Sequence, residues 1–472
     1  MPELYELGAL EIVRRVRARE VSRREVLEAH LDRIEAVDGV VNAVVERVDR
    51  EKALSAAEAA DRDHEARTDR PLDGVPVSIK DHFDVEGMLH TEGVRWFADR
   101  RSPGHSAVVQ RLLDAGAFVV GKSNQPDFQI RWNTVNDLYG ATRNPRNTSL
   151  TAGGSSGGDT AAVASGMAAL GLGADYGGSI RVPASFCGVF GLRPSAGRVP
   201  EVQALDPEKG GMTLDLMNSP GPIARTLDDL WAAFVALAGP DPRDPASVPV
   251  AAPEPVPGRQ ATTVLRMSRE TGAVVEPEVE RELDLVCAAL EAAGYRVVDG
   301  GIPNATRAPE IWAELVGNEL LHSALPDWHG LIAESNLQHI EAMFSLFDLG
   351  DSLAAWTRSI VERRETAQAT AQLMQEHPLI VAPVAGMKAP ALDFDQYLDL
   401  DATRDLFDHM RNVVWVNLLS LPSLALPNGI QLVARRFHES DAAAAAAAVV
   451  NALEPVSIAE PAPPPTDSRG RP

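Results

Sequence analysis

The chain has 472 residues, 45% of them hydrophobic and 24% charged, which is ordinary for a globular protein and enough for one large domain or two to three smaller ones. Its 44 Lys and Arg against 67 Asp and Glu give a net charge of −23, which disfavours nucleic acid and anionic membranes as partners. Cys187 and Cys287 cannot form a disulfide framework, so we expect a reduced, cytoplasmic setting.

Neither a secretory signal nor a membrane span is indicated by the sequence. Residues 1–20 carry charges throughout and have no uninterrupted apolar core. The nearest candidate for a span, Ala442–Val450, is shorter than the roughly 18 apolar residues that a bilayer requires. We interpret this run as a helix that packs against the core, and we expect no membrane partner.

Hydrophobic periodicity in the first part of the chain predicts helices that alternate with short strands. The expected helices cover residues 7–37 (as a pair), 51–67 and 106–115, and the expected strands cover residues 40–48, 75–79 and 118–120. The second helix opens with a capping box, in which Ser22 is followed three residues later by Glu25. Lys80 stands at the end of the second strand.

One segment, Gly116–Ser123, matches the Walker A pattern letter for letter. A phosphate cradle requires a flexible glycine-rich loop that leads into a helix. This segment instead has residues of strand character between its glycines, and Pro126 follows soon after it. We therefore do not expect a nucleotide site here.

The middle of the chain holds two Gly-Gly-Ser units, at Ser155 and at Ser179. Between them, Thr160–Leu172 is rich in Ala, Met and Leu and predicts a buried helix. Glycines around a serine suit a site where backbone N–H groups must face a ligand without a Cβ in the way. A flexible linker would not enclose an apolar helix, so we predict a functional site.

The rest of the chain predicts a sheet covered by helices, because strands and helices alternate in it. We expect helices at 226–238, 277–293 and throughout 305–375, strands at 262–267, 295–298 and 379–384, a Pro-rich loop at 239–258, and further apolar core at 415–427. The helical stretch carries several large apolar side chains, namely Trp312, Trp328, Met343, Phe344, Phe347 and Trp356. Core packing is the favoured interpretation of these residues, and an apolar acyl or amide pocket is the alternative.

Four segments together resemble the amidase signature family of serine hydrolases. They are Asp73–Asp81, Gly153–Gly158, Asp175–Pro183 and Phe186–Pro194. Asp159 departs from the family pattern, in which many members carry a small residue or Glu, and we expect this difference to leave the chemistry unchanged. The resemblance implies one α/β/α domain over residues 1–453, with a central mixed β-sheet covered by helices on both faces. It also implies a homodimer, and we expect residues 454–472 to form a disordered Pro-rich tail.

Hydrolysis of an amide requires a nucleophile, a base, an acid for the leaving amine, and donors for the oxyanion. The usual His base is not evident, since His82 and His105, the nearest to these segments, fit better as satisfied polar residues. A buried Lys loses its charge through desolvation, and Ser–Lys pairs are a known substitute for Ser–His.

The resemblance assigns Ser179 as the nucleophile, Lys80 as the base, and Ser155, after a cis peptide, as the proton relay between them. It assigns the oxyanion hole to the backbone N–H groups of Tyr176, Gly177, Gly178 and Ser179. It implies that Asp175 and Arg181 hold this loop in place through hydrogen bonds. The mechanism needs no cofactor and no metal, and the His and Cys residues show no metal-ligand spacing in the sequence.

Three functions are compatible with these residues. The first is a stand-alone amidase that cleaves the C–N bond of a small-molecule amide through an acyl-serine intermediate. The second is the amidase-like component of a tRNA-dependent amidotransferase, although Gln125–Phe128 is closer to the stand-alone members. The third is a binding or scaffold protein, which has no reason to retain Lys80, Ser155 and Ser179 together.

Overall fold

The alternating strands and helices build one large mixed sheet. The computed structural model describes residues 3–62, 69–205, 211–251, 253–254, 262–347, 349 and 353–463. Within these residues eleven strands follow the order β1-β3-β2-β8-β10-β9-β14-β15-β13-β11-β12. They are β1 (Val44–Arg47), β2 (Pro76–Lys80), β3 (Phe118–Ser123), β8 (Leu170–Ala174), β9 (Phe190–Arg193), β10 (Pro220–Ala224), β11 (Thr263–Arg266), β12 (Arg296–Asp299), β13 (Leu379–Pro383), β14 (Ser423–Ala425) and β15 (Ile430–Ala434).

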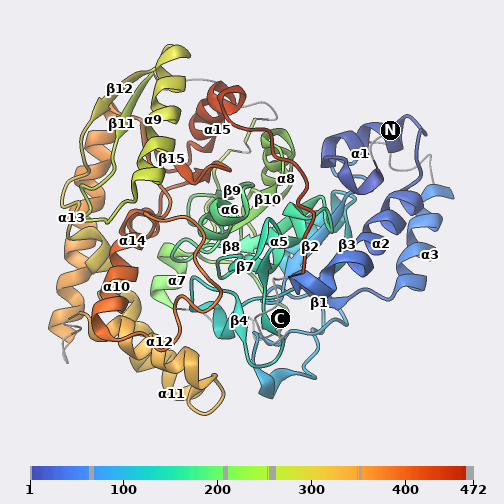
Figure 1. Ribbon diagram of the computed structural model, residues 1–472, viewed down its shortest axis with the longest axis horizontal. Helices are drawn as coiled ribbons and strands as arrows, with labels where there is room; N and C mark the ends of the chain where they lie inside the picture. The colour runs from blue at the N-terminus through green and yellow to red at the C-terminus, as the bar shows by residue number, and fades with distance from the viewer. Residues whose placement is uncertain are drawn as a thin grey trace.

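Helices cover both faces of this sheet, which confirms the expected α/β/α architecture (Figure 1). They are α1 (Ala9–Arg17), α2 (Arg23–Val41), α3 (Arg50–Arg62), α4 (Ala107–Asp114), α5 (Gly157–Ala164), α6 (Arg181–Cys187), α7 (Met212–Met217), α8 (Leu227–Leu237), α9 (Pro277–Ala292), α10 (Ala308–Glu319), α11 (Leu325–Trp328), α12 (Glu334–Ser345), α13 (Leu353–Glu376), α14 (Leu400–Leu418) and α15 (Glu439–Val449). Successive strand residues point to opposite faces of the sheet, and each face has its own hydrophobic core. In one core, Val77 and Ile79 of β2 pack with side chains of α1, α4 and α8. Side chains of α5, α6 and α14 form the other core.

The expected helix over Thr160–Leu172 is wrong, because the chain turns in the middle of this range. Helix α5 ends at Ala164, Gly166 adopts a φ of +77°, and β8 begins at Leu170. A short run of small apolar residues suits a fully buried strand as well as a buried helix, so composition alone could not separate them. The strand has a consequence for the site: β2 and β8 are parallel neighbours, so Lys80 and the loop after Ala174 lie at the same edge of the sheet.

Several local predictions are confirmed. The Ser22 hydroxyl accepts from the Glu25 N–H and the Glu25 carboxylate accepts from the Ser22 N–H, which is the predicted capping box. The Walker-like segment forms strand β3, which runs through to Ser123. The poly-Ala run lies in α15, and its alanines are largely buried.

The stretch from 305 to 375 is mainly helical, as predicted, and folds into α10 to α13 with a π-helical turn over Leu320–Ala324. Figure 1 shows these helices gathered at one end of the molecule, where α10 packs against both α13 and α14. Of the large apolar residues, Trp312, Met343 and Phe344 are buried. This group of helices therefore forms both a core and, as shown below, one wall of a pocket.

The two Pro-rich segments lie along the domain without forming helix or strand where they are described. In the loop, the Arg111 guanidinium donates to the carbonyls of Gly239 and Pro240, both at 2.8 Å. In the segment after residue 453, which was expected to be a disordered tail, Ala459 donates to the Ala164 carbonyl at 2.8 Å and Thr148 donates to the Ala462 carbonyl at 2.6 Å. The remainder of that prediction, residues 464–472, lies outside the described residues.

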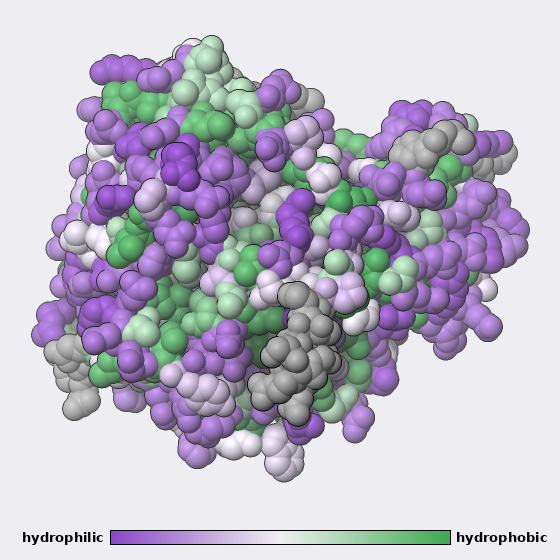
Figure 2. Space-filling model, viewed as in Figure 1, coloured by the Kyte–Doolittle hydropathy of each residue, from purple (hydrophilic) through white to green (hydrophobic). Residues whose placement is uncertain are grey.

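The surface reflects the excess of charged residues. Figure 2 shows hydrophilic residues over most of the face in view, most densely where α2 and α3 lie. Within the described part of the chain, no helix combines the length and the apolarity required to cross a bilayer.

Candidate active site

The centre of the site is a buried contact between an amine and a hydroxyl. Lys80 and Ser155 are almost completely shielded from solvent, and Lys80 Nζ lies 2.7 Å from Ser155 Oγ. Lys80 ends strand β2, and Ser155 precedes helix α5, after a cis Gly154–Ser155 peptide of the kind the resemblance implies. A Cβ at Gly154 would lie 2.7 Å from the Asn133 backbone, so the chain can pass at this point only as glycine.

Burial changes the protonation of this lysine. Desolvation lowers the pKa of Lys80 to about 8, while the carboxylates of Asp159 and Glu92 act in the opposite direction. Asp159 is itself fully buried and accepts a hydrogen bond from Ser78 Oγ, two residues before Lys80, at 3.1 Å. Burial raises the pKa of Asp159 to about 7, and in its ionised form this carboxylate favours the charged form of Lys80.

Ser179 lies beside the Ser155 segment and faces a pocket. The Ser156 N–H donates to the Ser179 carbonyl at 3.0 Å, which holds the two Gly-Gly-Ser loops side by side. Ser179 is 7% exposed and lines the pocket, whereas Ser155 and Lys80 are 1% and 0% exposed and do not belong to its lining. The structure thus places the Ser155 segment against both Lys80 and the Ser179 segment, and of the three predicted residues Ser179 lines the pocket.

Two indole rings orient the loop before Ser179. Trp312 Nε1 donates to the Tyr176 carbonyl at 3.2 Å, and Trp132 Nε1 donates to the Gly177 carbonyl at 2.8 Å. Because C=O and N–H point in opposite directions across a trans peptide, the first of these bonds directs the Gly177 N–H away from Trp312. A Cβ on Gly177 would lie 2.6 Å from the Trp312 ring, so glycine is needed for this approach.

One of the four predicted oxyanion donors is occupied. The Gly178 N–H donates to Asp175 Oδ1 at 2.9 Å, because Gly178 has a φ of +104° and curls back over that carboxylate. Among the described residues, the N–H groups of Tyr176, Gly177 and Ser179 have no hydrogen-bond acceptor. These three therefore remain candidates for an oxyanion hole, and Gly178 is better described as the bend that shapes it.

Asp175 and Arg181 form the support beneath this loop. Arg181 donates to both Asp175 oxygens, from Nε at 3.0 Å and from a terminal nitrogen at 2.9 Å, and both side chains are fully buried. Burial alone would raise the pKa of Asp175, but the adjacent guanidinium of Arg181 holds it well below its ordinary value. Asn417 of α14 donates to the same carboxylate at 2.8 Å, which ties the loop to the second half of the chain.

The pocket in front of Ser179 has mostly apolar and aromatic walls. Its lining comprises Gln129, Ile130, Arg131, Trp132, Tyr176, Gly177, Ser179, Trp312, Val316, His339, Ile340, Met343 and Phe344. One polar residue of the lining already has a partner within the protein: Arg131 forms a buried ion pair with Asp395 at 2.7 Å. Burial lowers the pKa of His339 to about 4, so its imidazole is neutral at physiological pH.

Sequence reasoning missed some residues of this site. Trp132, Asn417 and His339 lie far from the signature segments in sequence, and no local pattern pointed to them. It also found no metal-ligand spacing, yet the structure brings His82, His90 and Glu92 together. The close spacing of His90 and Glu92, with one residue between them, was the only local signal for this group, and it is too short to be specific.

Comparison with known proteins identifies the family. The Amidase family model matches residues 25–442. Indoleacetamide hydrolase from Bradyrhizobium diazoefficiens is 31% identical over 473 residues, covering 95% of this chain and 87% of that protein. The A subunit of the glutamyl-tRNA(Gln) amidotransferase from Geobacter sulfurreducens is 38% identical over 306 residues, covering 64% of this chain and 62% of that one. The crystal structure of a bacterial aryl acylamidase superposes with a TM-score of 0.81 at 26% identity, covering 96% and 97% of the two chains.

Fold and family define a hydrolase that acts on carbon–nitrogen bonds. The chain belongs to the amidase family, within the group that carries the amidase signature. The alternative of a non-catalytic scaffold is therefore not retained.

Proposed function

We propose that the protein hydrolyses the amide bond of a small apolar or aryl carboxamide through an acyl–Ser179 intermediate. The observation that carries this proposal is the buried 2.7 Å contact between Lys80 Nζ and Ser155 Oγ, next to Ser156, whose N–H donates to the Ser179 carbonyl. A neutral amine in this position can accept a proton through a hydroxyl, and such Ser–Lys arrangements replace the Ser–His pair in other hydrolases.

The proposed reaction has two halves. Ser179 Oγ attacks the amide carbon while its proton passes to Ser155, whose own proton passes to neutral Lys80. The C–N bond then breaks, and the leaving amine takes the proton back through Ser155, which leaves the acyl ester on Ser179. Water attacks this ester by the same proton route and releases the carboxylic acid. The free N–H groups of Tyr176, Gly177 and Ser179 would stabilise the oxyanion in both halves.

The pocket favours an aromatic or apolar acyl group. Trp132, Trp312 and Phe344 offer flat apolar surface beside Ser179, and neutral His339 can exchange one hydrogen bond with a polar edge of the substrate. The similar protein from Bradyrhizobium diazoefficiens is named for indoleacetamide, an aromatic primary amide. We therefore infer that arylacetamides are better substrates than short aliphatic amides.

The purified chain, without any partner, should release ammonia and acid from indole-3-acetamide or phenylacetamide. Ser179→Ala should abolish turnover, whereas Ser185→Ala should retain it, because Ser185 Oγ only donates to the Val182 carbonyl and lies outside the pocket lining. Acid quenching of the wild-type protein during turnover, followed by peptide mapping, would locate the ester. Activity in Ser179→Ala, or an ester at another serine, would contradict the nucleophile assignment.

The second candidate is the amidase-like component of a tRNA-dependent amidotransferase. It is favoured by the 38% identity to the amidotransferase chain from Geobacter sulfurreducens, but that match covers only 62% of the Geobacter chain. The experiment above separates the two functions, since a dependent component would release ammonia only with its partner chains and glutamine. A homodimer and a cytoplasmic location remain predictions, which sedimentation and cell fractionation would test.

A further inference from the structure

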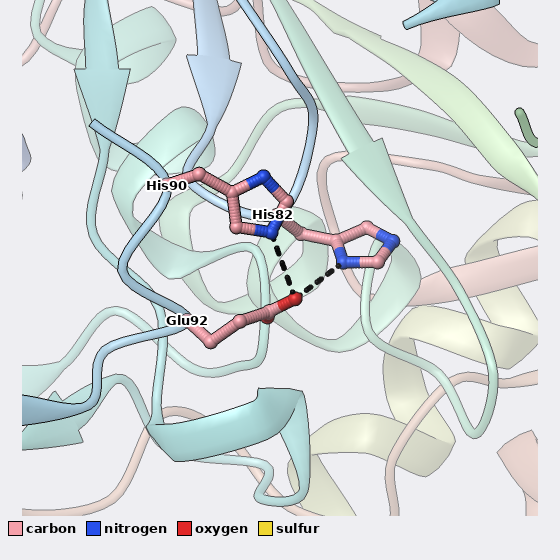
Figure 3. A group of neighbouring side chains, drawn as sticks. All are labelled: His82, His90 and Glu92. Carbon is pink, nitrogen blue, oxygen red and sulfur yellow. Dashed lines mark hydrogen bonds and ion pairs between the residues drawn. The ribbon is translucent and has the colours of Figure 1, made fainter. Parts of the chain in front are cut away.

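A second cluster of chemically reactive side chains lies beyond the end of β2, on the long connection between Lys80 and α4. His82, His90 and Glu92 come from this connection and converge on a single point (Figure 3). The proposed hydrolysis uses none of them. Each offers one donor atom, and these three atoms all lie within 4.8 Å of one another.

The geometry around Glu92 is that of a carboxylate shared by two imidazoles. Glu92 Oε1 lies 3.2 Å from His82 Nδ1 and 3.1 Å from His90 Nε2. Figure 3 shows both rings directing a nitrogen at this one oxygen. Ligand atoms at the corners of a tetrahedron around zinc, each about 2.0–2.1 Å from the metal, are about 3.3 Å apart. Both separations are close to this value, and the two ring nitrogens lie within 4.8 Å of each other.

The far side of each ring is held by another carboxylate. His82 Nε2 lies 3.0 Å from a Glu201 oxygen, and His90 Nδ1 lies 2.6 Å from a buried Asp84 oxygen. Metal-bound histidines commonly donate their other N–H to a carboxylate, which fixes the tautomer and the ring orientation. If each ring donates its outer N–H to its carboxylate, the lone pairs of His82 Nδ1 and His90 Nε2 face Glu92 Oε1, where a cation can lie between them.

The second oxygen of Glu92 also has a hydrogen-bond partner. It accepts a hydrogen bond from Gln125 Nε2 at 2.9 Å, so the carboxylate is oriented with Oε1 toward the two rings. The other oxygen of Glu201 accepts from Asn218 Nδ2 at 2.6 Å. The donor atoms are thus preorganised by contacts from three separate segments of the chain.

We propose that His82, His90 and Glu92 bind one divalent cation of the zinc class, with the fourth position taken by water. Two imidazole nitrogens and one carboxylate oxygen suit Zn²⁺, whereas Ca²⁺ and Mg²⁺ prefer all-oxygen sites. The cation would join three residues of the connection after β2 and so stabilise a part of the chain that has little ladder hydrogen bonding. The same side chains can also be joined by protons alone, as two imidazolium ions among carboxylates, and the experiment distinguishes these states.

Untagged protein should be stripped with a chelator, dialysed, loaded with Zn²⁺ and passed through a desalting column. We expect about one zinc per chain by elemental analysis and an upward shift of Tm on the order of a few degrees when Zn²⁺ is present. His90→Ala and the isosteric Glu92→Gln should lose both the bound zinc and the shift. His105→Ala should keep both, because His105 lies on the same connection but outside the three ligands.

Equal zinc in wild type and in Glu92→Gln would assign the metal to other histidines and overturn the proposal, as would a wild-type protein that retains no zinc. If His90→Ala fails to fold, Glu92→Gln alone decides, since it preserves size and removes only the charge. Anomalous scattering at the zinc edge from crystals should place the ion between the three donor atoms. Ser179→Ala should bind zinc like the wild type, so this outcome is independent of the proposed hydrolysis.

Discussion

The ends of two neighbouring parallel strands each carry a buried lysine, and the two amines differ in the groups that they contact. Lys80 ends β2 and Lys122 lies near the end of β3, where it pairs with Ile79 in the sheet register. Both side chains are fully buried, and burial lowers the pKa of both. They differ in what surrounds the nitrogen.

Lys122 Nζ donates to the carbonyls of Asp81, Phe83 and Leu89, at 3.0, 2.5 and 3.0 Å. Three acceptors use all three ammonium hydrogens, so loss of a proton would leave one buried carbonyl without a donor. Lys80 has one close partner, the Ser155 hydroxyl, which can donate as well as accept. The comparison indicates that burial alone does not distinguish a general base from a structural cation. The number of hydrogen-bond acceptors around the nitrogen does.

The largest effect is expected from Lys80→Met, which keeps the length of the side chain and removes the amine. We expect kcat/KM to fall by roughly 10²–10⁴-fold, the usual contribution of a general base. Tm should change little or rise, because a buried amine is replaced by an apolar group. A variant that retained wild-type rates would remove Lys80 from the chemistry.

The matched change on the next strand, Lys122→Met, should act on stability instead. Three buried carbonyls lose their donor, and an unsatisfied buried group costs about 1–3 kcal/mol, so we expect unfolding to become easier by about 3 kcal/mol or more. Urea unfolding measures this loss. The values of kcat and KM, taken well below the unfolding transition, should stay close to wild type, and a selective loss of kcat would show that the two lysines are not functionally distinct.

The pH dependence of kcat/KM tests the role of Lys80 without a mutation. Burial lowers the pKa of Lys80 to about 8, and only the neutral amine can accept a proton. At pH 7 about a tenth of the molecules hold that form, so kcat/KM should rise about tenfold per pH unit below 8 and level off above it. A profile that is flat between pH 6 and 9 would contradict a lysine base.

The smallest expected effect comes from the neighbour of Lys80, Asp159. Replacement by Asn keeps a hydrogen-bond acceptor for Ser78 and removes the negative charge that raises the pKa of Lys80. The pH range in which kcat/KM rises should therefore move to lower pH, and the maximum value of kcat/KM at high pH should change little. Asp32→Asn on α2, where the side chain is 61% exposed, is the charge-matched control and should not move this range.

The fold could be predicted, and three central residues could be proposed, because their signals are local. A capping box, an apolar strand that ends at Lys80, and two Gly-Gly-Ser units occupy continuous segments, so a resemblance can be recognised without coordinates. The same locality explains the error at Thr160–Leu172: a run of small apolar residues has no period that separates a buried strand from a buried helix, and the sheet around it decides.

The sequence by itself determined which residues are candidates for the chemistry, because side-chain type and spacing are written in it. Only the tertiary structure decided which backbone N–H groups are free, since Gly178 is bonded to Asp175 through a bend that its neighbours impose. It also decided that Lys80 faces one hydroxyl while Lys122 faces three carbonyls, and that two histidines share one carboxylate. Hydrogen bonds depend on distances between segments remote in sequence, and packing alone sets those distances.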